Sequence, residues 1–146
     1  MGIARSELAA IFERAPELAD RVEGSDPASL VASARSLIAR MTEEERIGVL
    51  NAHPRIGAGS ASLSALSRGE QGSRADVATT RDLAALNDQY ERKFGFRCVV
   101  FVAGRSKAEL VPVFRERLRR ARADELATGI DEFLAITRDR LERIEE

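Results

Sequence analysis

The sequence predicts an all-α fold, a single-domain bundle of about seven helices with one buried extended segment. Apolar residues recur at the three- and four-residue spacing of helices through most of the chain, and capping residues precede several of these runs. Only residues 96–102 have the composition of a strand, and one strand without a partner cannot form a sheet. Since 146 residues are the length of one ordinary domain, we expect a single domain over residues 1–146.

Charge and composition exclude several classes of function. The chain has 23 basic and 24 acidic residues with no segregated basic arm, so we expect no nucleic-acid partner. No apolar run approaches the roughly 18 residues that cross a bilayer, so we expect no membrane partner. The single cysteine, Cys98, excludes an intrachain disulfide framework and fits a reducing compartment. Together these features predict a cytoplasmic protein.

Three helices are predicted before residue 42. Two short ones, over residues 6–14 and 16–22, are expected before Gly24, a natural left-handed cap residue. Asp26 as N-cap and Pro27 at the first helical position begin the third. Its apolar face is formed by Leu30, Val31, Ala34, Leu37, Ile38 and Met41.

The fourth predicted helix leads to the only histidine of the chain. Thr42 and Glu45 form a capping box, which predicts a helix from residue 43 to about residue 51. Because Pro54 stops the helix, we expect His53 to lie at its exit. The inner face of this helix is predicted to be Ile47 and Leu50.

After the Gly- and Ser-rich middle of the chain, the sequence predicts one helix followed by the extended segment. Thr80 is expected to cap a helix over residues 81–94, and Gly95 to end it. Residues 96–102 are then expected to be extended and buried. The stripe by which the helix packs is predicted to be Leu83, Leu86, Tyr90 and Phe94.

Two further helices complete the predicted bundle. Ser106 and Glu109 form a capping box that opens a helix to about residue 120, which Pro112 can kink. The last helix is expected from residue 124 to about residue 145. Its packing face is predicted to be Leu126, Ile130, Phe133, Leu134, Thr137, Leu141 and Ile144.

His53 is the first candidate for proton chemistry, because histidine titrates near neutral pH. The structural alternative is a residue at a helix terminus that binds the last carbonyl groups, and composition alone favours that alternative. No metal site is expected, since no paired-histidine or HExxH spacing is present.

Two other groups of polar residues are candidates for binding a ligand. Ser67, Glu70 and Gln71 would present a hydroxyl, a carboxylate and an amide together, a set that suits a urea-like ligand, although a capping box explains the first two. Arg140 lies at the border of the apolar face of the last helix. It is either a surface arginine or an anion-binding group at the floor of a pocket.

In their order along the chain, these motifs resemble the 2-oxo-4-hydroxy-4-carboxy-5-ureidoimidazoline (OHCU) decarboxylase family of urate degradation. The most specific parts are Ala-His-Pro at residues 52–54, the turn at residues 67–71, and Leu-Asn-Asp-Gln-Tyr-Glu-Arg-Lys-Phe-Gly-Phe at residues 86–96. The resemblance runs from Phe12 to Leu141.

The resemblance implies an all-helical homodimer that needs no cofactor and converts OHCU, a small-molecule substrate, to (S)-allantoin and carbon dioxide. It implies that His53 is the catalytic imidazole and that Pro54 presses on the substrate beside it. It also implies that Glu70 holds the ureido and ring groups together with Ser67 and Gln71. From its charge we expect a second, catalytic role for Glu70, which would disfavour the substrate carboxylate and favour its loss as neutral gas.

The resemblance further implies that Arg140 pairs with an anionic or carbonyl part of the substrate. Backbone groups around Cys98, Val99 and Val100 are implied to complete the pocket. The chain departs from the family pattern where the usual Gly-Phe-x-Phe-Val has Cys98 in place of its second aromatic residue, and where Pro112 and Gly129 interrupt helices.

A second class of function fits the same residues. The domain could be a catalytically silent purine-metabolite binding module or a helical interaction module, because a retained pocket can bind without turnover. Decay of freshly generated OHCU in the presence of the protein distinguishes the enzyme from the silent module.

Overall fold

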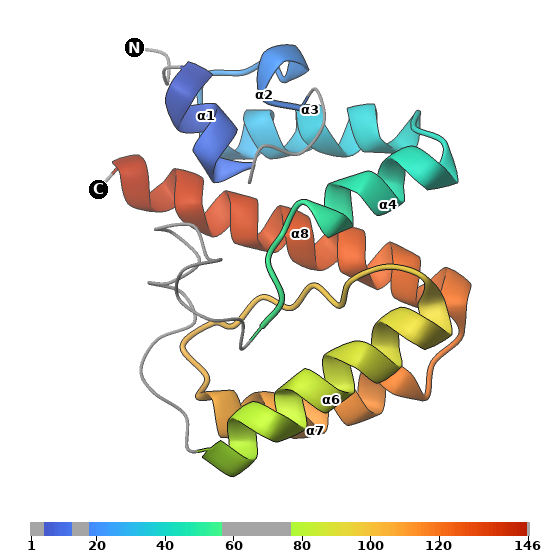
Figure 1. Cartoon of the computed structure of the whole chain (residues 1–146). Coiled ribbons are helices and arrows are strands. Elements are labelled where there is room, and N and C mark those ends of the chain that lie inside the picture. Colours follow the sequence, from blue (N-terminus) through green and yellow to red (C-terminus); the bar gives the residue numbers. More distant parts are fainter. Residues whose placement is uncertain (1–4, 13–17, 57–76, 146) are drawn as a thin grey trace.

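The computed structural model describes residues 5–12, 18–56 and 77–145, and these residues form seven helices and no strand. Figure 1 shows α8 across the middle of the molecule, with α1, α3 and α4 on one side and the α6–α7 pair on the other. The helices are α1 (Arg5–Ile11), α2 (Leu18–Arg21), α3 (Pro27–Ala39), α4 (Glu43–Asn51), α6 (Val77–Phe94), α7 (Lys107–Leu118) and α8 (Arg122–Glu145). The all-α prediction is confirmed, and among the described residues no helix is long and apolar enough to cross a membrane.

The predicted caps are confirmed where they depend on local sequence. The side chain of Asp26 accepts a hydrogen bond from the backbone N–H of Ser29, and Pro27 begins α3. Thr42 begins α4 through its capping box with Glu45. The same arrangement of Ser106 and Glu109 begins α7, which runs through Pro112 to Leu118.

Several predicted helix limits are wrong. α1 ends at Ile11 instead of residue 14, and α2 ends at Arg21 instead of residue 22. The predicted start of this second helix, residue 16, lies outside the described residues. α6 begins at Val77, so Thr80 lies inside the helix instead of capping it, because the preceding Val-Ala-Thr turn is itself helical. α8 begins two residues early, at Arg122.

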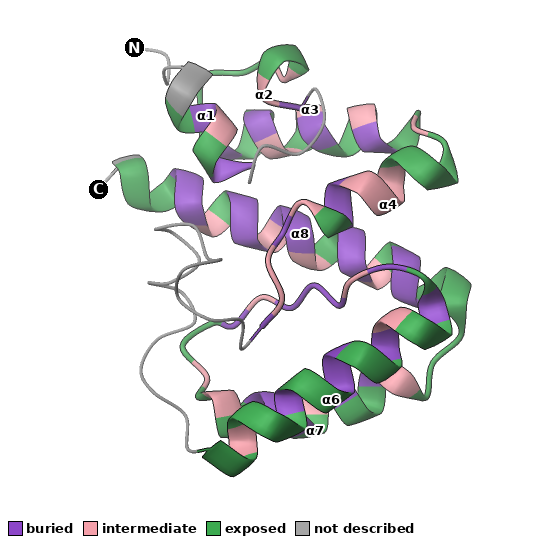
Figure 2. Cartoon of the chain, viewed as in Figure 1, coloured by how far each residue is buried: buried purple, intermediate pink, exposed green. Residues whose placement is uncertain are grey.

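The predicted packing stripes are confirmed except at the C-terminal end. The predicted face of α6 is buried, as is that of α8 up to Leu141 (Figure 2). Ile144 is 46% exposed, contrary to the prediction. Gly129 has a packing reason, since a Cβ at this position of α8 would lie 3.0 Å from Leu50 Cδ1 of α4.

Residues 96–102 cross the interior as an extended segment between α8 and the α6–α7 pair, as predicted (Figure 1). Five of the seven side chains are at most 5% exposed, and the segment begins after Gly95, whose φ of +84° ends α6. These five are Phe96, Cys98, Val99, Val100 and Val102.

A buried ionic network fixes this segment between three helices. Glu125 of α8 is fully buried and accepts hydrogen bonds from the Tyr90 hydroxyl at 2.6 Å and from Arg117 Nε at 2.5 Å. Arg120 Nη1 binds the other carboxylate oxygen at 3.1 Å. Arg117 Nη1 donates to the backbone carbonyl of Val99 at 2.8 Å, so the network joins α6, α7 and α8 to the extended segment.

The phenol of Tyr90 is held in its protonated form within this network. Burial is the largest cause that raises its pKa, and the hydrogen bond to Glu125 raises it further. Tyr90 is therefore a hydrogen-bond donor at every physiological pH, which is what the Glu125 carboxylate requires.

The substitution Glu125→Gln tests the contribution of the network to stability. It keeps the shape of the side chain but leaves the buried Arg117 guanidinium without its counter-charge, so we expect unfolding free energy to fall by about 3 kcal/mol or more. Urea denaturation followed by circular dichroism measures this change. The matched control is Glu142→Gln, which removes an exposed ion pair with Arg138 and should cost about 0.5 kcal/mol or less. Equal, small losses for both variants would contradict the prediction.

Candidate functional site

His53 lies one residue past the C-cap of α4 with its side chain turned into the protein. Its backbone N–H donates to the carbonyl of Leu50 at 3.2 Å, which tightens the end of the helix. The side chain is 6% exposed, and its ring meets the Phe133 ring of α8 edge to face, with centroids 5.0 Å apart and an interplanar angle of 78°. The imidazole therefore has an apolar wall on one side.

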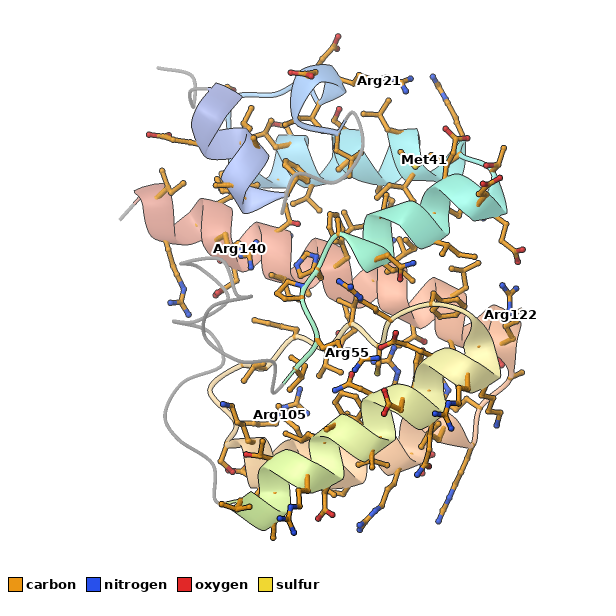
Figure 3. The ribbon with its side chains drawn as sticks, viewed as in Figure 1. Arg21, Met41, Arg55, Arg105, Arg122 and Arg140 are labelled. Atoms are coloured by element: carbon orange, nitrogen blue, oxygen red, sulfur yellow. The ribbon has the colours of Figure 1, made fainter. Side chains whose placement is uncertain are left out.

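The segment after His53 is fastened to α6. The Asn87 side chain is buried, and its Nδ2 donates to the carbonyl of Ile56 at 2.9 Å. Arg55, labelled in Figure 3, binds Asp88 at 3.0 Å and Glu91 at 2.7 Å. These bonds fix residues 55 and 56 against one face of α6.

Side chains of the neighbouring elements bind one edge of the extended segment. Backbone groups of its odd-numbered residues, Arg97, Val99 and Phe101, bind side chains of α4, α7, α8 and the turn that follows the segment. The N–H groups of Arg97 and Phe101 donate, and the carbonyls of Val99 and Phe101 accept, at 2.6 to 3.3 Å. The partner side chains are Asn51, Glu132, Arg117 and Arg105.

Cys98 and Val100, which alternate with these residues, differ. The backbone N–H and C=O groups of Cys98 and Val100 make no hydrogen bond to any residue that the structure describes. In an extended chain the polar groups of successive residues point to opposite sides, so these four groups form the other edge. A ligand beside them would find two donors and two acceptors.

A cavity of about 220 Å³ brings this segment together with His53. It is smaller than the roughly 300–1,000 Å³ sites of drug-sized ligands and suits a small metabolite. One wall consists of His53, Pro54 and Ile56, a second of residues 98–104, and a third of Ile136, Asp139 and Arg143 of α8.

A tight turn closes the end of the second wall. Ala103 and Gly104 have φ values of +52° and +78°, and Arg105 N–H donates to the carbonyl of Val102 at 3.0 Å. Positive φ at both central positions is typical of a type I′ turn, and it is uncommon for a residue with a Cβ such as Ala103.

The predicted site residues fall into three groups. His53, Pro54, Cys98, Val99 and Val100 line one cavity, so the structure brings these five together. The predicted roles of Ser67, Glu70 and Gln71 concern positions outside the described residues.

Arg140 binds the end of α1 through one nitrogen of its guanidinium. Arg140, labelled in Figure 3, is a residue of α8 and is 2% exposed. Its Nη1 donates to the backbone carbonyl of Ile11, at the end of α1, at 2.9 Å. Arg140 is not among the described residues that line the cavity.

Sequence reasoning missed the residues that α8 contributes to the cavity. Ile136, Asp139 and Arg143 are spaced by three and four residues and therefore share one helix face. Arg143 Nε binds Asp139 Oδ2 at 2.9 Å, which puts a charged pair at this wall. Arg140, four residues after Ile136 and three before Arg143, borders the same face, so the spacing alone does not say which of these side chains line the cavity.

Cys98 has the character of an inert buried thiol. Burial is the largest cause that raises its pKa, to about 12; the nearby Arg117 opposes this, while Glu125 and Glu132 add to it.

Within residues 5–12, 18–56 and 77–145, no group of three His, Cys, Asp or Glu side chains is placed to hold a metal ion.

The fold and the cavity define a class, an all-α protein with a small internal site built from one histidine and one edge of an extended segment. A family model described as OHCU decarboxylase matches residues 3–142. The chain belongs to the OHCU decarboxylase family.

Relatives in sequence agree with this assignment. The chain is 30% identical to 2-oxo-4-hydroxy-4-carboxy-5-ureidoimidazoline decarboxylase of Haloferax volcanii, over 90% of this chain and 82% of that protein. It is also 30% identical to the uric acid degradation bifunctional protein of Bacillus sp. (strain TB-90), over 94% of this chain. It spans only 29% of the length of that bifunctional protein.

Solved structures share the fold. A crystal structure of OHCU decarboxylase in the presence of (S)-allantoin superposes with a TM-score of 0.75 at 21% identity, covering 94% of this chain and 96% of the other. A crystal structure of (S)-allantoin synthase gives a TM-score of 0.66 at 18% identity, covering 95% of this chain and 48% of the other.

The reactivity of Cys98 tests the burial of the second wall. With a pKa of about 12, only about one thiol in 10⁴ is ionised at pH 8. We expect the native protein to react with Ellman's reagent far more slowly than the guanidinium-denatured protein, which should release one equivalent at once. A fast stoichiometric reaction of the native protein would mean that the thiol is exposed or activated.

Proposed function

We propose that this protein decarboxylates OHCU to (S)-allantoin and carbon dioxide, as one domain over residues 1–146 and without a cofactor. The observation that carries the proposal is the shared cavity of His53 and residues 98–100, in a chain of the OHCU decarboxylase family.

The chemistry of the substrate explains why so few groups suffice. When the bond between the ring carbon and the carboxylate breaks, the adjacent imine of the substrate accepts the electron pair. The imine nitrogen takes up a proton as it accepts this pair. The enol-like intermediate then needs one proton on carbon, and the neighbouring hydroxyl loses its proton to become a carbonyl, so that one net proton from solvent replaces the carbon dioxide. The protein therefore has to supply orientation and proton transfer, and no external electron acceptor.

His53 is proposed to manage these protons. Its imidazole is the only side chain of its type in the chain, and it lines the cavity in a near-perpendicular contact with the Phe133 ring. A ring held in this way can deliver a proton to one face of a planar intermediate, which accounts for a single enantiomer of the product.

The unbonded edge of the extended segment is proposed to hold the ureido group. A ureido group has N–H donors and a carbonyl acceptor, and the backbone of Cys98 and Val100 offers the complementary set. Because these contacts use backbone atoms, the cysteine that replaces the usual aromatic residue does not remove them.

The remaining site residues are proposed from the resemblance. Pro54, which lines the cavity, would press on the substrate beside His53. Ser67, Glu70 and Gln71 would hold the ureido and ring groups, and the charge of Glu70 would favour loss of the substrate carboxylate as neutral gas. Arg140 would bind an anionic or carbonyl part. We also propose a cytoplasmic homodimer, on the basis of the resemblance and the single cysteine.

The first test is turnover with and without the imidazole. Fresh OHCU is mixed with the protein, and its ultraviolet absorbance and the optical activity of allantoin are followed. We expect His53→Ala to lower the rate by about 10² to 10⁴, the usual contribution of a general acid or base. Circular dichroism should show the same helix content in both proteins. Binding of OHCU without turnover by the wild type would identify a silent binding module instead.

The second test separates the charge of Glu70 from its capping role. Glu70→Gln can still close a capping box, so we expect the melting temperature to change little while turnover falls sharply. Glu109→Gln, at the confirmed capping box of α7, is the matched control and should leave turnover unchanged. A fully active Glu70→Gln protein would leave Glu70 a structural role only.

A further inference from the structure

Arg97 connects the end of α4 with the second wall of the cavity. It immediately precedes Cys98, and its backbone N–H donates to Asn51 Oδ1 at 2.9 Å. Its Nη1 donates to the backbone carbonyl of Asn51 at 2.9 Å and to that of His53 at 2.8 Å. Three hydrogen bonds from one residue thus cross 44 to 46 positions of sequence.

Two of these bonds satisfy carbonyl groups at and just beyond the end of α4. The last carbonyls of a helix have no partner within the helix, and a cation near them is favourable. The carbonyl of His53 lies beyond α4, so no turn of that helix holds it. Arg97 therefore caps α4 from another part of the chain and extends the cap to His53.

The other contacts of this region do not replace Arg97. Asn87 fixes the carbonyl of Ile56, and Arg55 binds α6, which holds the chain two or three residues further on. Arg97 itself is not among the described residues that line the cavity. Any effect of Arg97 on chemistry in the cavity must then pass through the residues it binds.

We propose that Arg97 is a positioning residue for His53. By holding the carbonyl of His53, it sets the direction in which the side chain leaves the backbone, and so keeps the imidazole edge-on to Phe133 inside the cavity. The kinetic part of this inference rests on the function proposed above, whereas the placement of the ring does not. A misplacement of about 1 Å can cost about 10²-fold in rate, so the effect is measurable.

The test uses the fact that His53 is the only histidine, so a protein without a histidine tag has one Hε1 and one Hδ2 signal. Phe133 shifts these signals by its ring current. We expect Arg97→Ala to move both signals toward their values in the unfolded protein at the same pH. In the same variant, kcat should fall about 10- to 100-fold with KM within about twofold. Arg97→Lys, which keeps a donor and the charge, should recover part of both effects.

Arg35→Ala is the matched control. It removes an arginine that bridges α3 and α8 through an exposed ion pair with Asp131, and it should leave the His53 signals and kcat unchanged. If Arg97→Ala fails to fold, the His53 signals and kcat of Arg97→Lys are compared with those of the wild type, and a change in both is expected.

Signals of His53 that coincide in Arg97→Ala and wild type would overturn the proposal, as would moved signals with an unchanged kcat. A wild-type protein without turnover would instead overturn the proposed function, and the position of the His53 signals would still decide whether Arg97 places the ring.

Discussion

Glu125 imposes the constraint on which the site depends. A carboxylate with no exposure to water is tolerated only when cations and hydrogen-bond donors surround it, and Tyr90, Arg117 and Arg120 provide them. A second nitrogen of Arg117, Nη1, donates a hydrogen bond to the backbone carbonyl of Val99. The requirement to neutralise one buried charge therefore determines where the extended segment lies, and with it one wall of the cavity. The apolar side chains of the segment fill space around this arrangement.

Much of the fold could be predicted because helix starts are local. The caps at Asp26, Thr42 and Ser106 each depend on residues three positions apart, and all three occur in the structure. Thr80 has the same local chemistry but lies inside α6, since a possible cap does not prevent a helix from beginning earlier. Ile144 keeps the spacing of the packing face, yet its exposure depends on where the neighbouring helix ends, which spacing does not contain.

The site was less accessible from sequence because it combines distant segments. His53 was a candidate as the only histidine, whereas residues 98–100 were assigned through the family resemblance alone. The cavity that joins them depends on the path of the chain between α8 and α6. Arg97 occupied a variable position in the motif, and its bonds to the end of α4 follow no sequence pattern. On α8, Arg140 and the Asp139–Arg143 pair are neighbours in sequence but point to different surroundings. Only the packing of the helix decides which of them lies at the cavity.

The extended segment also bears on solubility. Phe-Arg-Cys-Val-Val-Phe-Val, residues 96–102, has the composition of peptides that stack into intermolecular β-sheets, with one charge and no proline. In the native chain one edge is occupied by side chains, and the other borders a cavity of about 220 Å³, which has no room for a strand of another molecule. The edge at Cys98 and Val100, which no described residue binds, thus faces the protein's own cavity. A partial unfolding that withdraws α4, α7 and α8 from the segment exposes its backbone groups together with its apolar side chains.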